Sequence, residues 1–411
     1  MKRVTTIVVG AGQCGLAMSH ALRRHSVDHL VLERGRIANS WRTERWDGLR
    51  LLTPNWMNGL AGRPYRGPDP DSFMTCGEFA EDLTRAAALD GAPVLQETRV
   101  LALDPLGGGY RVQTDQGAIA CDSVVIASGE CALPRIPGLA GDLPPGVLQL
   151  TPQSYKRPAD VPEGGVLVVG AGASGLQIAR ELALAGRRVT LAVGNHLRLP
   201  RRYRGADILW WMHRLGVLDL PPSGEDELDR LRRAPSLPLL GDPSHADIDL
   251  NGLQDLGIEI VGRLAGLTEG KAWFSGSLAN ACASADLKLA RLLDRIDAHA
   301  DRAGIDAPPA CRLPATRIPE APRLMLRLGE GGIGTVVWAT GYRPDHRWVK
   351  LPVFDGKGRI RHDGGVVGEG IYVLGLRHLR SARSTHIAGA PRDARVLARH
   401  LTDRLGGRAA A

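Results

Sequence analysis

Two near-identical glycine-rich segments, TIVVGAGQCG and VLVVGAGASG, stand about 160 residues apart in this chain of 411 residues. Each follows a short apolar run that is typical of a buried parallel strand, and each precedes an apolar stripe at helical spacing. A strand, a glycine turn and a helix in this order form a dinucleotide-binding unit, whose helix N-terminus meets a pyrophosphate. The repeat therefore predicts an α/β chain with two Rossmann-like dinucleotide-binding domains.

The first copy has every feature that such a unit needs. Its glycines are spaced G-x-G-x-x-G, and a second apolar run ends at Glu33, 23 residues after Gly10. A carboxylate at that distance accepts hydrogen bonds from the ribose hydroxyls of the nucleotide. We interpret Cys14 as filling a small-residue position in the loop rather than as a reactive thiol. The expected cofactor contacts here are Gly10, Gly12, Gln13, Cys14, Gly15, Glu33 and Arg34.

The second copy lacks the acid, because the same offset from Gly170 reaches Val193. A carboxylate there would repel the 2′-phosphate of NADP, so its absence favours NADPH and leaves NADH possible. A basic segment follows, GNHLRLPRRYRG, which either contacts that phosphate or is a solvated surface loop. The expected contacts of this copy are Gly170, Gly172, Ala173, Ser174, Gly175, His196, Arg201 and Arg202.

Two further apolar runs end in small residues and a glycine, SVVIASG and TVVWATG. Such endings let the backbone approach a bound nucleotide or cross between domains. The residues concerned are Ala127, Ser128, Gly129, Ala339, Thr340 and Gly341.

Composition excludes several classes of protein. Lys and Arg number 52 against 44 Asp and Glu, a net charge of +8, but these residues are scattered, so no nucleic-acid partner is expected. No run approaches the roughly 18 apolar residues of a membrane helix, and the N-terminus enters a strand at once, so we expect a cytoplasmic protein without a membrane segment. The 6 cysteines and 12 histidines show neither C-x-x-C nor metal-ligand spacing, so no dithiol centre and no metal are expected.

The segment SWRTERWDGLRLLTPNW, residues 40–56, resembles the flavin-containing monooxygenases and their bacterial relatives. Their W-R pair and W-D-x-L-x-L-x-T-P pattern are matched, and the candidate cofactor residues in it are Trp41, Arg42, Trp46, Leu51 and Thr53. The resemblance implies that the first site binds FAD, that the second binds NADPH, and that the NADPH domain is inserted into the FAD domain. It places the FAD domain at residues 1–135 and 346–411 and the NADPH domain at 136–345, with a helical insertion at about 206–325.

The resemblance also implies an activity. NADPH would reduce FAD, a C4a-hydroperoxyflavin would form with O₂, and one oxygen atom would pass to an amine nitrogen or a sulfide sulfur of a small-molecule substrate. It implies a flavin-facing role for Asn55, although a turn-forming role is the alternative. It places Asp393 near the flavin at the start of the closing helix, where helix capping is an equal explanation. A homodimer is left open.

Two positions depart from the family pattern and keep other functions open. Thr151 stands where the family fingerprint has a histidine, and Asn195 stands where a basic residue near the NADPH is expected. One alternative is an FAD-dependent reductase that passes electrons to a partner or a quinone without oxygenation. A non-catalytic flavin or nucleotide sensor is another. The missing cysteine pair argues against a disulfide reductase with an in-chain dithiol.

Overall fold

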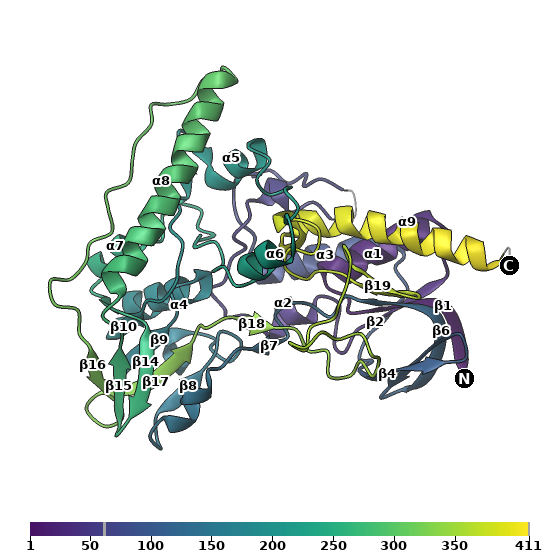
Figure 1. The fold of residues 1–411 in the computed structure, drawn as a ribbon, viewed down its shortest axis with the longest axis horizontal. Helices are drawn as coiled ribbons and strands as arrows, with labels where there is room; N and C mark the ends of the chain where they lie inside the picture. The colour runs from purple at the N-terminus through teal and green to yellow at the C-terminus, as the bar shows by residue number, and fades with distance from the viewer. Residues whose placement is uncertain (61–62, 410–411) are drawn as a thin grey trace.

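The computed structural model describes residues 1–60 and 63–409, which form two α/β lobes lying side by side (Figure 1). The first lobe contains both ends of the chain, and the second contains the middle. Each lobe is built on parallel strands that begin with a strand–glycine loop–helix unit. The predicted fold, two Rossmann-like domains with the second inserted into the first, is thus confirmed, whereas the residue limits of the domains remain a prediction.

The first lobe has an eight-stranded sheet in the order β19-β20-β6-β1-β2-β3, with β5 paired to β6 and β4 paired to β5. β1 pairs in parallel with β2 and β6, as the buried apolar runs require. Its strands are β1 (Lys2–Val9), β2 (His29–Leu32), β3 (Val94–Leu95), β4 (Val100–Leu106), β5 (Gly109–Thr114), β6 (Gly117–Ile126), β19 (Val366–Gly368) and β20 (Ile371–Val373).

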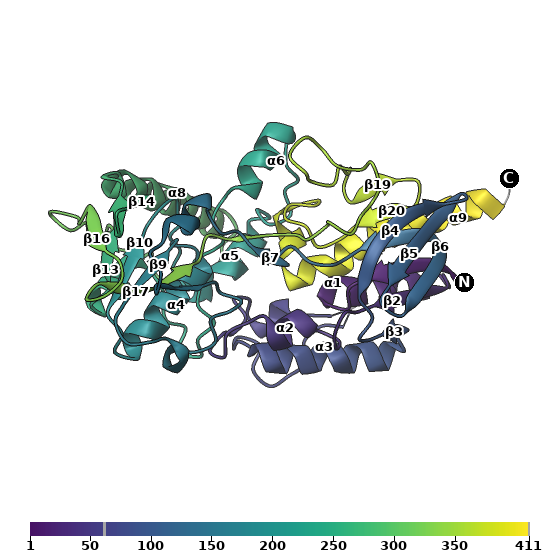
Figure 2. The ribbon, with the colours of Figure 1, turned by 90° about the horizontal axis from the view of Figure 1, so that it is seen from below.

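Helices cover this sheet and close its core. α1 (Gln13–Arg24) and α9 (Ala390–Ala409) lie side by side in both ribbon views (Figures 1 and 2). Met18 of α1 and Leu397 of α9 are fully buried in one apolar cluster with Ile7 of β1. α2 (Asn39–Thr43) and α3 (Cys76–Asp90) complete the lobe. The closing helix at the C-terminus therefore holds the first dinucleotide unit in place.

The second lobe has a five-stranded parallel sheet in the order β13-β10-β9-β17-β8. Its strands are β8 (Leu148–Leu150), β9 (Gly165–Val169), β10 (Val189–Ala192), β13 (Glu259–Val261) and β17 (Ile333–Trp338). α4 (Ala173–Leu184) follows β9 and is the helix of the second glycine loop.

The range 206–325 is not purely helical, which corrects the sequence prediction. It contains α5 (Ile208–Arg214), α6 (Glu225–Arg232), α7 (Leu250–Asp255) and α8 (Leu278–Arg302). It also supplies β13 to the edge of the parallel sheet, where GIEIVG pairs with β10, and the hairpin strands β14 (Leu264–Thr268) and β15 (Lys271–Phe274). A three-residue strand such as β13 carries too little periodicity to be separated from its helical surroundings.

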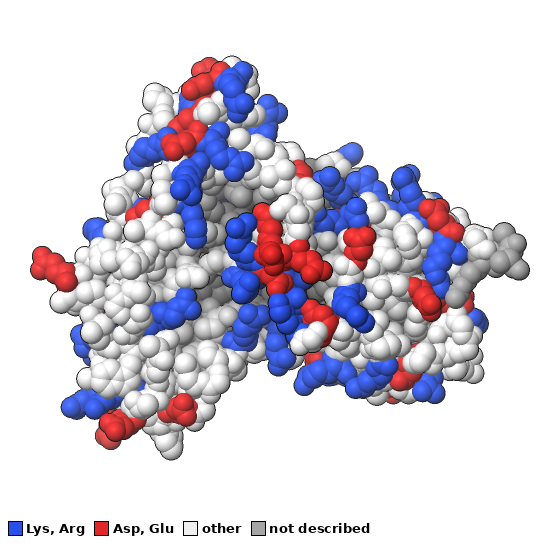
Figure 3. All heavy atoms as spheres, in the orientation of Figure 1, with Lys and Arg blue, Asp and Glu red and all other residues white. Residues whose placement is uncertain are grey.

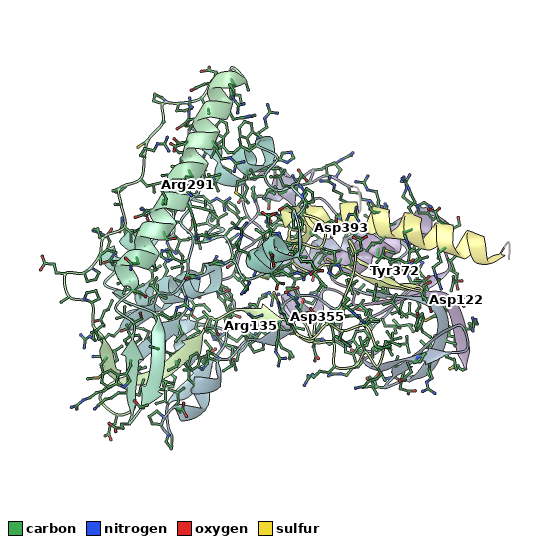
Figure 4. The ribbon with its side chains drawn as sticks, viewed as in Figure 1. Asp122, Arg135, Arg291, Asp355, Tyr372 and Asp393 are labelled. Carbon is green, nitrogen blue, oxygen red and sulfur yellow. The ribbon has the colours of Figure 1, made fainter. Side chains whose placement is uncertain are left out.

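The two crossings between the lobes lie next to each other. β7 (Leu133–Pro134) runs into the second lobe, β18 (Tyr342–Arg343) runs back, and the two pair as an antiparallel ribbon. The N–H of Arg135 donates to the carbonyl of Gly341 at 2.9 Å, and Figure 4 shows Arg135 at this junction. Trp46, from the first lobe's sequence, is buried in the apolar core of the second.

In the part of the chain that the structure describes, no helix is both long enough and apolar enough to cross a bilayer.

Candidate functional site

The first glycine loop is a tight turn in which two glycines are required by their surroundings. Gly10 has φ +106°, and a Cβ there would lie 2.6 Å from the carbonyl oxygen of Ala127. A Cβ on Gly15 would lie 1.7 Å from the carbonyl oxygen of Gly10. Gly12 differs, because its φ is −81° and no atom lies within 4 Å of its Cβ position. The loop is therefore closed on two sides and open on the side where a ligand approaches.

Glu33 is fixed beside this loop at the carboxyl end of β2. It is buried, and its two carboxylate oxygens accept hydrogen bonds from the N–H of Ala11 at 2.8 Å and the N–H of Gly35 at 3.1 Å. Arg34 points elsewhere and forms an exposed ion pair with Glu44. Of the two neighbours, only Glu33 is held against the loop.

Cys14 and Asp393 meet where the N-terminal ends of α1 and α9 converge. The Cys14 Sγ lies 2.6 Å from the Cβ position of Gly375, so the thiol fills the space that this glycine leaves. Burial, followed by the nearby Asp393 carboxylate, raises the pKa of Cys14 to about 12, so the thiol stays protonated. Asp393 lies in the first turn of α9 (Figure 4), is buried, and has a raised pKa because of that burial. Its Oδ2 has no hydrogen-bond partner among the described residues.

The residues of the W-R…W-D segment position the backbone. The Trp41 Nε1–H donates to the side-chain oxygen of Gln13 at 3.0 Å, next to the loop. Arg42 ties α2 to α3 by donating to Glu81, to Thr84 and to the Ala80 carbonyl. Trp46 joins the second lobe's core, as described above, so this segment links the lobes.

The following turn uses its polar side chains internally. The Thr53 hydroxyl donates to the Asn58 side-chain oxygen at 2.6 Å, and the buried Leu51 donates its N–H to the Met74 carbonyl at 2.8 Å. The Asn55 Nδ2 donates to the Asp69 carbonyl at 2.8 Å, and its Oδ1 accepts from the Met74 N–H at 3.1 Å. The buried amide of Asn55 is therefore occupied within the turn, which favours its turn-forming role over a flavin-facing one.

The second glycine loop reproduces the first. Gly170 has φ +111°, with its Cβ position 2.5 Å from the Ala339 carbonyl oxygen, and the Cβ position of Gly175 is 1.8 Å from the Gly170 carbonyl oxygen. Gly129 and Gly341, which end the small-residue turns, have φ +91° and +95°. Ser128 has a buried hydroxyl without a partner among the described residues, whereas the Thr340 hydroxyl donates to the Arg135 carbonyl.

The two loops differ at one backbone group. The Ala173 N–H, at the first residue of α4, donates to the hydroxyl of Ser236 at 3.1 Å. Ser174, the next residue, forms a side-chain hydrogen bond with Tyr342 at the lobe junction.

The basic segment is only partly a surface loop, because two of its candidate residues, His196 and Arg201, are buried. Arg201 is 1% exposed, and its guanidinium donates to both carboxylate oxygens of Asp207 at 2.6 Å and to the Leu52 carbonyl at 2.8 Å. His196 is also buried, which lowers its pKa. Arg202 is exposed and donates to the Gly205 carbonyl. Arg201 therefore serves an internal ion pair, because a buried cation needs a carboxylate of its own.

Sequence reasoning missed an arginine that lies beside Asn195. The exposed Arg263 donates to the side-chain oxygen of Asn195 at 3.1 Å, and its guanidinium lies 3.4 Å from the Cβ position of Gly194. Arg263 follows β13, and β13 pairs in parallel with β10, so the two carboxyl ends meet. Only this pairing, which no local pattern reveals, brings Arg263 to Asn195.

A second missed group lies at the carboxyl ends of β6 and β20. The Glu130 carboxylate accepts from the N–H of Arg377 at 3.3 Å, and the Arg377 guanidinium donates to the Ala234 carbonyl at 2.9 Å. Burial raises the pKa of Glu130 despite the neighbouring arginines, of which Arg377 is the first and Arg232 the second. The group joins the first lobe to the segment that carries Ser236.

The first lobe fits FAD. The open side of Gly12, the free N–H groups at the start of α1 and the unpartnered buried oxygen of Asp393 together offer a phosphate cradle and a hydroxyl acceptor. Among the described residues no cluster of three His, Cys, Asp or Glu side chains can hold a metal ion, and all six cysteines are free thiols.

Known proteins share this arrangement. The family model of pyridine nucleotide-disulphide oxidoreductases matches residues 7–204. An uncharacterised CzcO-like oxidoreductase of Geobacillus kaustophilus is 30% identical over 398 residues, which cover 96% of this chain and 97% of that protein. A flavin-containing monooxygenase from Stenotrophomonas maltophilia has a TM-score of 0.68 at 18% identity, over 98% of this chain and 100% of that one. The ornithine N-hydroxylase of Kutzneria sp. 744 has a TM-score of 0.64 at 14% identity, over 98% and 99%.

Nearly full-length identity at this level identifies the family, and the solved structures share the fold. The chain belongs to the CzcO-like oxidoreductases, and it shares its fold with the flavin-containing monooxygenases.

Proposed function

We propose that this enzyme is an FAD-dependent, NADPH-consuming monooxygenase acting on an amine nitrogen or a sulfide sulfur of a small molecule. In the overall reaction NADPH supplies two electrons, one atom of O₂ goes to the substrate and the other leaves as water. One observation carries the proposal: two glycine loops have the same geometry, but only the first has an acid, Glu33, fixed beside it. FAD, when bound, supplies the hydride acceptor and the site of O₂ activation.

In the first lobe, the N–H groups at the start of α1 bind the pyrophosphate of FAD, and Glu33 accepts from a ribose hydroxyl. Asp393 offers its unpartnered oxygen to a further hydroxyl of the cofactor. The Cys14 thiol stays protonated and only fills space beside the loop.

In the second lobe, the start of α4 binds the pyrophosphate of NADPH. Val193 replaces the acid that would repel a 2′-phosphate, and Arg263 with Asn195 binds that phosphate instead. In this proposal the positive charge comes from Arg263, just beyond the neighbouring strand β13, rather than from position 195. NADPH is therefore the preferred donor, and NADH the weaker one.

At the carboxyl edge of the first sheet, Glu130 is our candidate proton carrier. It follows the Gly129 turn, and its raised pKa lets it hold a proton closer to neutral pH than an exposed glutamate does. Two solved structures support this type of chemistry, because the proteins that share the fold are a flavin-containing monooxygenase and an ornithine N-hydroxylase.

Anaerobic reduction followed by oxygen tests the proposal. The purified protein is analysed for FAD, reduced with NADPH without oxygen, and then mixed with ¹⁸O₂ and a panel of amines and sulfides. Incorporation of one ¹⁸O atom per NADPH consumed supports the monooxygenase. Flavin reduction that yields only hydrogen peroxide, or that passes electrons to a quinone, would identify a reductase. If neither NADPH nor NADH reduces the flavin, the remaining alternative is a non-catalytic flavin or nucleotide sensor.

Two further expectations remain predictions, a cytoplasmic location and the absence of a nucleic-acid partner, and the sequence leaves open whether the protein is a homodimer. Light scattering of the purified protein measures the oligomeric state directly.

A further inference from the structure

The open sides of the two glycine loops have different surroundings at the second glycine of each loop. At the first loop nothing lies within 4 Å of the Cβ position of Gly12, whereas at the second loop the Ser236 hydroxyl oxygen lies 3.1 Å from the Cβ position of Gly172. The same oxygen accepts from the Ala173 N–H. That N–H is one of the free donors at the start of α4 that a pyrophosphate oxygen uses. A hydroxyl of the chain thus accepts from a backbone donor that a bound pyrophosphate would use.

Ser236 belongs to a strap, residues 225–241, that crosses from one lobe to the other. At one end is α6, which lies between the lobes in both ribbon views (Figures 1 and 2). The Asp229 carboxylate of α6 pairs with Lys357 and Arg359 of the first lobe. In Figure 3 acidic side chains gather at the place of α6, beside a hollow between the lobes and among Lys and Arg.

The rest of the strap is held by two backbone carbonyls and by the Arg232 guanidinium, which donates to the ring of His362 at 3.1 Å. The Ala234 carbonyl accepts from the Arg377 guanidinium of the first lobe at 2.9 Å, and the Leu239 carbonyl accepts from the Gln177 amide of α4 at 2.6 Å. Between these two points Ser236 is set against the loop. The strap is thus fastened to the first lobe on one side of Ser236 and to α4 on the other.

The ion pairs that anchor α6 to the first lobe are weak. Lys357 is 66% exposed and Arg359 is 39% exposed at their side chains, and exposed ion pairs contribute little to stability. The strap buries few large side chains between Glu225 and Ser236, since α6 has no buried residue. Segments with little buried surface open at small cost in free energy.

We propose that Ser236 is a gating residue of the nicotinamide-dinucleotide site: its hydroxyl holds the Ala173 N–H until the pyrophosphate replaces it and the strap moves aside. The proposal rests on the assignment of NADPH to the second loop. It makes the strap a competitor of the dinucleotide, so loosening the strap strengthens binding. A hydroxyl that served as a ligand of the bound phosphate would have the opposite effect.

Binding of NADP⁺ to the FAD-loaded enzyme separates these roles. The variant Ser236→Ala frees the Ala173 N–H, and we expect the Kd of NADP⁺ to fall about two- to tenfold, the weight of one hydrogen bond. Asp229→Asn loosens the α6 anchor and lowers the Kd in the same direction. Glu227→Gln is the matched control: among the described residues, the hydrogen-bond partners of the Glu227 carboxylate are Ser223 and Arg230, which do not belong to the first lobe, so the Kd of NADP⁺ for this variant stays unchanged.

The kinetic readout is a lower KM for NADPH in Ser236→Ala with kcat unchanged at saturating NADPH. A Kd that rises in Ser236→Ala overturns the gate and makes the hydroxyl a phosphate ligand. An unchanged Kd in both Ser236→Ala and Asp229→Asn also overturns it.

Limited trypsin digestion gives a readout that does not depend on activity. The strap offers cleavage sites after Arg230, Arg232 and Arg233. We expect NADP⁺ to accelerate cleavage at these sites in the wild-type enzyme, because the strap leaves the loop. Protection by NADP⁺ would show that the strap closes over the dinucleotide, and would overturn the proposal. If NADP⁺ binds neither the wild-type enzyme nor any variant, and NADPH does not reduce the flavin, the proposed function fails together with the gating role of Ser236. If the wild-type enzyme and all variants bind NADP⁺ equally well, the gating role is rejected and the proposed function stands.

Discussion

Replacing Gly12 with alanine tests whether the open side of the first loop is where FAD lies. The residue has φ −81° and ψ −173°, which any amino acid adopts, and its Cβ position has no atom within 4 Å. The protein without cofactor therefore accommodates the methyl group without strain. A Gly→Ala change at a compatible position stabilises a fold by about 0.4–1 kcal/mol, because the unfolded chain loses freedom. We expect the unfolding free energy of the apoprotein to stay the same or rise by that amount.

The cost appears only when the cofactor binds. The methyl group projects into the space that the pyrophosphate needs, and it separates a phosphate oxygen from a backbone N–H of α1. A hydrogen bond to a charged group contributes about 1.5–3 kcal/mol. At 1.4 kcal/mol for each factor of ten, the Kd of FAD rises about 10- to 150-fold.

The assay is a pair of measurements on Gly12→Ala and Gly15→Ala. Urea denaturation of the apoproteins gives stability, and fluorescence titration with FAD gives affinity. Gly15→Ala is the contrasting variant, because its Cβ would lie 1.7 Å from the Gly10 carbonyl oxygen, and such overpacking costs about 1–3 kcal/mol or more before any cofactor binds. An apo Gly12→Ala protein as stable as wild type that binds FAD within twofold of the wild-type Kd would refute the reasoning.

Three further predictions concern the second lobe and the response to pH. Arg263→Ala lowers the NADPH-over-NADH ratio of kcat/KM about 10- to 100-fold by removing a charged hydrogen bond to the 2′-phosphate, and steady-state kinetics with both donors measures it. Arg201→Met leaves that ratio unchanged but lowers the unfolding free energy by about 3–5 kcal/mol, because Asp207 loses its buried partner; a changed ratio with intact stability would contradict the structure. Burial lowers the pKa of His386 from 6.5 to about 4, so the unfolded chain binds more protons between these pH values and stability falls as the pH decreases through them. Thermal unfolding of the apoprotein from pH 7 to pH 4 follows this loss, and His386→Gln makes the slope shallower; an unchanged slope would contradict the contribution of His386.

The glycine loops were predictable because their requirements are local. Gly10 and Gly15 are demanded by contacts within a strand–turn–helix unit, and that unit is written in consecutive residues. The acid at Glu33 follows from the fixed length of the same unit, and the structure places its carboxylate against the loop. Local rules of this kind predicted the fold, and they are also the basis for the cofactor contacts expected at the first loop.

The second half depended on contacts between distant segments. Nothing near Arg201 in the sequence indicates that it is buried against Asp207 and the Leu52 carbonyl, so it resembled a phosphate ligand. Arg263 gave no signal, since it is 68 residues from Asn195 in the sequence and reaches it through the pairing of β10 and β13. Residue spacing in the sequence cannot predict contacts between side chains that come together only through the order of strands in a sheet.

The ribbon of β7 and β18 gives the second lobe the character of a detachable module. The chain leaves the first lobe at Leu133 and returns at Arg343, and these two residues are paired neighbours. A short turn joining them would close the first lobe without stretching any strand of its sheet. Such an excision would expose Trp46 and Met57, which are buried in apolar clusters of the removed lobe. A single-lobe flavin carrier made from this chain therefore needs polar residues at positions 46 and 57 as well as a new turn.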